Sequence, residues 1–140
     1  MPEFIAAVTC IDGRFHRPLQ EWAVTHLRAR YVDLVTAPGV SASLAAGDRT
    51  VLDDIGEHLR PSMEVHRSTT VVVAAHEGCA GDPSTPKQQR AALPEAAARL
   101  HAHLGGIPSV IGVYVHADGR VESLASLAGA ADARGDLARR

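Results

Sequence analysis

The stretch Thr69 to Gly81, TTVVVAAHEGCAG, decides the fold that we predict for this chain. Its first part, Thr69 to Ala75, is an almost continuous apolar and β-branched run, which is typical of a strand buried on both faces of a parallel sheet. His76 ends the run, and Cys79 follows in a loop that contains glycine. We therefore expect a buried strand with two potential metal ligands at its carboxyl end.

An earlier stretch, FIAAVTCIDGR, has the same design. The apolar run Phe4 to Thr9 predicts a second buried strand. Cys10 follows it, with Asp12 and Arg14 at the next alternate positions. The chain contains two cysteines, and each of them follows a predicted strand. We therefore expect the rest of the chain to bring these two strand ends together.

The other predicted elements alternate between strands and helices. Strands are expected at 31–36 and 109–116, a short antiparallel strand at 121–124, and helices at 18–30, 48–59 and 87–104. The pair Asp118-Gly119 favours a hairpin before the last strand. This alternation predicts an α/β fold: a mostly parallel four-stranded sheet with helices on both faces and a short antiparallel edge strand.

Several breaks in the pattern affect the helices. Pro18 suits the first position of a helix, where its missing N–H has no consequence. Ser41 to Gly47 is small and polar, as expected of a loop or a frayed turn. Pro61 predicts the end or a kink of one helix, with a second short piece after it. Pro94 predicts a kink in the last helix or a break into two shorter ones.

Composition narrows the class of protein. With 140 residues, the chain is expected to form one domain, with a core at about 4–124 and a tail at 125–140 that is a loose helix or disordered. Aromatic residues make up only 4% of the sequence, so the core is expected to consist of small side chains. Such a core suggests that stability is shared with a partner subunit. The net charge of −2, without a basic block, argues against nucleic-acid binding.

The expected location follows from two absences in the sequence. The N-terminal stretch MPEFIAAVTC lacks the basic region of a secretory signal, and no apolar run is long enough to span a membrane. A cytoplasmic location is therefore predicted, where thiols stay reduced and are available as ligands or nucleophiles.

The two strand ends predict a common site. Ligands of parallel sheets bind at the carboxyl ends of strands, where the strand order reverses. If the two strands are neighbours, Cys10, His76 and Cys79 converge. Two thiolates and an imidazole are ligand types that zinc prefers, and three protein ligands leave a fourth position open for catalysis. Arg14 can hold Asp12 in a bidentate pair, and Asp12 can then orient a zinc-bound water.

Each feature also has an ordinary structural explanation. Cysteines are commonly inert apolar residues, and an Asp–Arg pair in a loop commonly contributes little. A metal-free alternative makes Cys79 a nucleophile with His76 as its base. His16, close to the Asp–Arg pair, is either a proton shuttle or a solvated loop histidine. The occurrence of both motifs at separate strand ends favours the zinc site.

The two motifs together resemble a known family. Cys10-Ile11-Asp12-Gly13-Arg14 resembles the Cys-x-Asp-x-Arg signature of the β-class carbonic anhydrases, and His76-Glu77-Gly78-Cys79 resembles their His-x-x-Cys. In order and spacing, the resemblance extends over residues 4 to 124, including a strand and turn at 35–40 and a final strand with its edge hairpin at 110–124.

This resemblance implies a function and a set of roles. Cys10, His76 and Cys79 would bind Zn²⁺, and Asp12 and Arg14 would form the catalytic dyad. The reaction would be the reversible hydration of carbon dioxide to bicarbonate by zinc-bound hydroxide. In some members the aspartate itself occupies the fourth zinc position. The resemblance also implies a homodimer or a higher even-numbered oligomer.

The sequence departs from the family near the substrate. The turn is Ala37-Pro38-Gly39 where the family has Asn-Ala-Gly, Glu77 adds a carboxylate next to the metal, and the aromatics and glutamine of the carbon dioxide pocket have no clear match. Two alternatives therefore stay open. One is a hydrolase of carbonyl sulfide or carbon disulfide on the same site. The other is a non-catalytic binding module stabilised by zinc.

Overall fold

A five-stranded sheet organises the fold. The computed structural model of the protein describes residues 3–130. The strands are β1 (Phe4–Thr9), β2 (Tyr31–Thr36), β3 (Thr70–His76), β4 (Ser109–Val115) and β5 (Val121–Leu127). The helices are η1 (Gly13–Phe15, a 3₁₀ turn), α1 (His16–His26), α2 (Val40–Ala45), α3 (Arg49–Glu64) and α4 (Pro86–His103).

The strand order is β2-β1-β3-β4-β5, with parallel pairing from β2 to β4 and antiparallel pairing of β5 on β4. The predicted fold class is therefore confirmed, with five strands when the edge strand is counted. The order reverses between β1 and β3, because the chain first adds β2 on one side of β1 and then β3 on the other. The switch point thus lies between the two strands that carry the sequence motifs.

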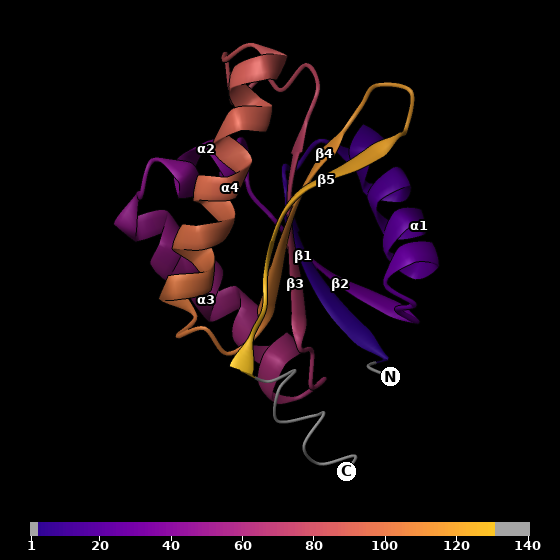
Figure 1. Ribbon diagram of the computed structural model, residues 1–140, viewed down its shortest axis with the longest axis vertical. Coiled ribbons are helices and arrows are strands. Elements are labelled where there is room, and N and C mark those ends of the chain that lie inside the picture. Colours follow the sequence, from indigo (N-terminus) through magenta and orange to yellow (C-terminus); the bar gives the residue numbers. More distant parts are fainter. Residues whose placement is uncertain (1–2, 131–140) are drawn as a thin grey trace.

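Helices cover both faces of this sheet (Figure 1). On one face α2, α3 and α4 pack over Ala6 and Val8 of β1, and on the other face α1 packs over Ile5 and Ala7. Alternate residues of the strand thus point to opposite faces, as the pleat requires. Because both faces are buried, β1 and β3 need apolar residues at nearly every position, which explains the continuous runs in the sequence.

Two helices differ clearly from the sequence prediction. α1 runs from His16 to His26, whereas a helix was predicted at 18–30, so Pro18 is its third residue and it ends four residues earlier. The ring is tolerated there because the first N–H groups of a helix lack partners within it. A short helix, α2, forms where a loop or frayed turn was predicted. It starts after Gly39, whose φ of 57° few other residues adopt, and it is held by the burial of Val40 and Leu44.

Neither internal proline divides its helix. α3 continues through Pro61 and α4 continues through Pro94. A proline removes one backbone hydrogen bond at a cost of roughly 3 kcal/mol. Burial on both sides of each proline offsets this cost, through Leu59 and Ser62 in α3 and through Leu93, Ala96 and Leu100 in α4. The predicted end or break at these prolines is therefore wrong.

The edges of the sheet differ from each other. β5 continues to Leu127, beyond the predicted Leu124, and its register with β4 shifts between Gly112 and Val113, which leaves Leu124 out of the pairing. The predicted tail from 125 onward is thus partly strand, and residues 131–140 lie outside the described part of the chain. At the other edge, the middle of β2 is only half-buried.

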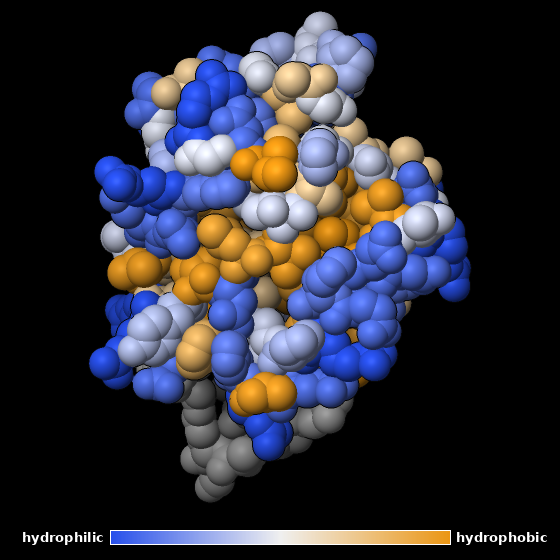
Figure 2. Space-filling view, turned by 180° about the vertical axis from the view of Figure 1, so that it is seen from behind, coloured by the Kyte–Doolittle hydropathy of each residue, from blue (hydrophilic) through white to orange (hydrophobic). Residues whose placement is uncertain are grey.

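Apolar side chains form a band across the back of the molecule (Figure 2). Among the described residues, no helix is both long and apolar enough to cross a membrane.

Candidate metal centre

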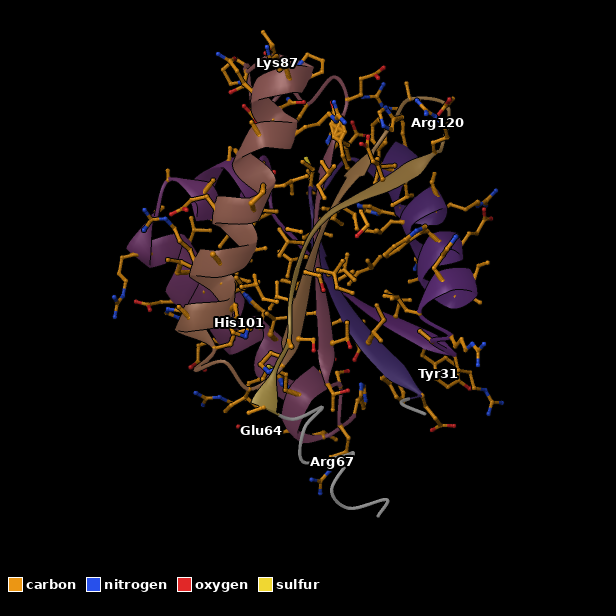
Figure 3. The ribbon with its side chains drawn as sticks, viewed as in Figure 1. Tyr31, Glu64, Arg67, Lys87, His101 and Arg120 are labelled. Carbon is orange, nitrogen blue, oxygen red and sulfur yellow. The ribbon has the colours of Figure 1, made fainter. Side chains whose placement is uncertain are left out.

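Three potential ligands converge at the carboxyl ends of β1 and β3. Cys10 directly follows β1, His76 is the last residue of β3, and Cys79 lies in the turn that follows. Their donor atoms all lie within 4.8 Å of one another, and the two sulfur atoms are 3.8 Å apart. Lys87, at the start of α4, lies at the top of the view in Figure 3, and Tyr31, at the amino end of β2, lies at the right in the lower half. Because the strand order reverses between β1 and β3, the site occupies the switch point of the sheet.

His76 presents an unpaired nitrogen to this group. Its Nδ1 lies 2.9 Å from the carbonyl oxygen of Glu77. A carbonyl can only accept, so Nδ1 carries the proton and Nε2 keeps its lone pair. The side chain is 2% exposed, and its Nε2 has no hydrogen-bond partner in the described protein. Buried polar atoms are normally paired, whereas a histidine that binds a metal donates its other N–H to such a carbonyl.

The two thiols respond differently to their surroundings. Burial raises the pKa of Cys10, but hydrogen bonds to its sulfur, that from the backbone of Gly39 first, lower it more, to about 7. Burial raises the pKa of Cys79, and the adjacent Cys10 raises it further. One thiolate therefore forms readily, and the second is resisted by the first. A bound cation would offset this repulsion between the two thiolates. The donor set and the unpaired nitrogen thus fit a zinc ion.

A close approach of two backbone turns supports the site. Gly39, just after β2, has a φ of 57°, and a Cβ there would overlap the carbonyl oxygen of Gly81. Only glycine therefore allows the turn after β2 to contact the loop that carries Cys79. The same turn brings the backbone of Gly39 against Cys10. The sequence analysis placed this turn near the substrate by resemblance but did not foresee its contact with the Cys79 loop, for which the Pro-Gly pair was the available signal.

Asp12 and Arg14 form the predicted pair beside this group. The Nε of Arg14 lies 3.0 and 3.2 Å from the two carboxylate oxygens of Asp12, and Nη2 lies 2.6 Å from Oδ2. The backbone N–H of Arg14 also donates to Oδ1 at 3.1 Å. The hydrogen bonds from the Arg14 side chain lower the pKa of Asp12 to about 2. Asp12 is not part of the three-residue ligand group, because its carboxylate is directed to the arginine.

A buried chain of polar groups holds the loop after Cys79. The hydroxyl of Tyr114 donates to Oε1 of Gln89 at 2.9 Å, and Nε2 of Gln89 donates to the carbonyl of Asp82 at 3.3 Å. The backbone N–H of Asp82 in turn donates to the carbonyl of Cys79. Glu77 lines a surface hollow with Cys79 and Gln89. Sequence reasoning gave Gln89 no role, because its partners come from distant parts of the chain.

The comparisons with known proteins agree with this geometry. A family model described as "Putative carbonic anhydrase" matches residues 1–125. The chain belongs to this family. The resemblance inferred from the two motifs is thereby confirmed. No curated protein matches the chain.

Solved structures of β-carbonic anhydrases share the fold. Isoform I from Trichomonas vaginalis superposes with a TM-score of 0.59 at 17% identity, over 91% of this chain and 84% of that one. A tetrameric enzyme from Sordaria macrospora gives a TM-score of 0.55 at 14% identity, over 88% of this chain and 80% of that one. At identities this low, the similarity shows that the folds are alike. The roles of the individual site residues remain predictions.

Proposed function

We propose that this member of the carbonic anhydrase family is a zinc-dependent lyase that catalyses the reversible hydration of carbon dioxide to bicarbonate. The observation that carries the proposal is the Cys10–His76–Cys79 group, with its donor atoms within 4.8 Å of one another and a buried, unpaired Nε2. Family membership supports this reaction over others that use a thiol and an imidazole.

The residues divide the chemistry between them. Cys10, His76 and Cys79 would hold the metal and leave a fourth position open. Zinc bound there would lower the pKa of a water molecule and so supply the nucleophile. Asp12, kept ionised and oriented by Arg14, would accept a hydrogen bond from the reacting group and hold it toward the substrate. Arg14 is the positioning partner of this carboxylate.

The pairing of Asp12 argues against a purely structural zinc. Structural zinc sites have four protein ligands. The ligand group in the described chain has three members, and the nearby carboxylate of Asp12 is engaged by Arg14. A metal-free Cys79–His76 mechanism would leave Cys10 without a role at 3.8 Å from Cys79. Both alternatives are thus less consistent with the geometry than a catalytic zinc.

Stopped-flow measurement of carbon dioxide hydration tests the proposal, on protein whose zinc content has been determined. We expect a rate that depends on zinc and is lost in Asp12→Asn with zinc content unchanged. Full zinc occupancy without hydration at neutral or alkaline pH would rule out this substrate. Carbonyl sulfide and carbon disulfide would then be assayed on the same preparation, and no turnover of either would favour the non-catalytic module.

Assembly is a further part of the proposal. The homodimer or higher even oligomer expected from the sequence is supported by the half-buried edge strand β2, whose Val32, Leu34 and Val35 are incompletely covered. One structural neighbour is a tetramer. Sedimentation across a range of protein concentrations tests this, and a monomer at every concentration would contradict it. All strands of the described residues belong to one sheet, which supports the prediction of a single domain. The cytoplasmic location remains a prediction.

A further inference from the structure

The side chain of His16 contacts the backbone of a proposed metal ligand. Its Nε2 lies 2.8 Å from the carbonyl oxygen of Cys10. Because the carbonyl can only accept, the Nε2 of His16 must carry the proton. The distance is at the short end of the range for an N–H···O hydrogen bond. His16 is the first residue of α1 and is only half-exposed, so the ring is held between the helix and the loop.

This contact closes the loop from Cys10 to His16 on itself. Within the loop, the carbonyl of Asp12 accepts the backbone N–H of Phe15 at 3.3 Å, and the carboxylate of Asp12 accepts that of Arg14. Phe15 is buried and stacks on the ring of His76. The loop therefore carries one ligand and both members of the dyad, and it also packs against a second ligand.

We propose that His16 is a positioning residue of the metal centre. By donating its Nε2–H to the carbonyl of Cys10, it sets the backbone direction at this ligand and at the start of the Asp12–Arg14 turn. This inference rests on the proposed function, since it takes Cys10 as a metal ligand. It differs from both sequence hypotheses for His16, because it gives the ring a structural contact with the carbonyl of Cys10.

The mechanism follows from the place of the contact. Cys10 lies just beyond the last residue of β1 that pairs with β2, Thr9. Past that point the ladder no longer orients the backbone, and a side-chain donor takes over this function. Groups that orient metal ligands typically change metal affinity or activity by about 10–100-fold when they are removed. A contact to the ligand's backbone should act at the lower end of this range.

A pair of variants with similar shape isolates the hydrogen bond. His16→Gln places an N–H donor near the position of Nε2, and His16→Met has the same length without a donor. His26→Met is the control, because His26 lies on the same helix and is exposed, away from the ligand group. Zinc affinity is measured by competition with a chromogenic chelator. The absorption spectrum of the Co²⁺-substituted protein reports the geometry of the thiolate ligands.

We expect His16→Met to weaken zinc binding by about 10-fold and to alter the Co²⁺ spectrum. His16→Gln should restore most of the affinity and the wild-type spectrum, and His26→Met should match the wild type. If zinc-free His16→Met does not fold, His16→Ala takes its place with the same expectation. Wild-type affinity and spectrum in the variant without a donor would overturn the inference, and so would equal losses in the Met and Gln variants.

The same experiment separates this inference from the proposed function. A wild type that binds one zinc and shows the expected pattern, but does not hydrate carbon dioxide, supports the role of His16 and refutes the reaction. A wild type that hydrates carbon dioxide while all His16 variants keep its zinc affinity refutes the role alone. A wild type that binds no zinc refutes both.

Discussion

The imidazole of His76 stacks on the phenyl ring of Phe15, with ring centroids 4.1 Å apart and an interplanar angle of 20°. The contact joins the loop after β1 to the end of β3. Together with the hydrogen bond from Nδ1 to the carbonyl of Glu77, it fixes the ring in both tilt and rotation. The unpaired Nε2 is therefore held in one direction before any metal binds.

Phe15→Leu should separate this orienting effect from simple loss of the core. Leucine keeps an apolar side chain but cannot stack, so we expect modest destabilisation and a clear loss of zinc affinity. Phe15→Ala should cost about 3–5 kcal/mol of unfolding free energy, as is usual for a buried phenylalanine. Urea unfolding of the zinc-free proteins and zinc titration measure the two effects. Equal zinc affinities in Phe15→Leu and the wild type would contradict an orienting role.

Two glycines offer a test of the close approach beside the site. Gly39 and Gly78 both have positive φ, at 57° and 67°. A Cβ at Gly39 would overlap the carbonyl of Gly81, whereas a Cβ at Gly78 would meet no atom within 4 Å. Gly78→Ala should therefore cost only the backbone term, about 1–2 kcal/mol. Gly39→Ala should cost more and should also weaken zinc binding, because the turn must move away from the loop that carries Cys79.

Thermal unfolding of the two alanine variants, with and without zinc, measures this difference. Because both positions have a positive φ, any additional loss of stability in Gly39→Ala reports the contact between the turns. Equal destabilisation of the two variants, with equal zinc affinity, would show that the loop adjusts without cost.

Zinc should stabilise the fold through these same ligands. A ligand that binds only the native state at 100 times its dissociation constant adds about 2.7 kcal/mol. We expect the melting temperature to rise with zinc in the wild type and much less in Cys79→Ser. Chelation should also make Cys79 reactive toward a disulfide reagent, since this thiol is half-buried and a bound metal would cover its sulfur, whereas Cys10 is buried in the fold itself. Thiol reactivity unaffected by zinc would contradict this ligand set.

Much of this site was predictable because its parts follow local rules. The bounds of β1 and β2 match the sequence prediction, since apolar runs of that length with sharp breaks have one simple interpretation. The switch point followed from the alternation of strands and helices. What the sequence could not show was the set of contacts made across the fold. The stack of Phe15 on His76 depends on β3 lying beside β1, and the burial of Gln89 depends on Tyr114 from β4.

The wrong predictions for the helices also result from contacts made across the fold. α2 has a weak local signal, and it forms because Gly39 turns the chain so that Val40 and Leu44 meet the core. Pro61 and Pro94 are strong local breakers, but the burial around them outweighs their cost. In each case a tertiary contact overrides a local preference. His76 was expected just after its strand, yet it pairs with Val115 as the last residue of β3.

The Asp12–Arg14 pair has a natural control within the chain. Asp118-Gly119-Arg120 repeats the Asp-Gly-Arg sequence in the turn between β4 and β5, with Arg120 at the tip of the hairpin (Figure 3). There too the backbone N–H of the arginine donates to the carboxylate, and its Nε lies 3.2 Å from Oδ2. The paired geometry is thus a property of the local sequence. Only the position of Asp12, two residues after Cys10, connects it with the metal centre.

Replacing each arginine should therefore change stability in the same direction with pH and should have different effects on function. Hydrogen bonds from Arg14 lower the pKa of Asp12 from 3.8 to about 2, and those from the backbone and side chain of Arg120 lower that of Asp118. A carboxylate with a lowered pKa stabilises the fold above its unfolded pKa and loses this contribution as the pH falls through the folded pKa. In zinc-free protein, Arg14→Met should lower the free energy of unfolding by its full amount above about pH 5. The difference from the wild type should vanish near pH 2.

Arg120→Met should show the same direction with pH but a smaller effect, because the backbone N–H of residue 120, the main cause of the lowered pKa of Asp118, is kept. Carbon dioxide hydration should fall steeply in Arg14→Met at equal zinc content, since the freed Asp12 no longer holds one orientation, and it should be unchanged in Arg120→Met. Acid titration of unfolding and stopped-flow rates on the same two variants measure both effects. Wild-type rates in both variants would mean that Asp12 acts without its arginine. Equal loss of hydration in both would mean that the effect is not specific to the pair beside Cys10.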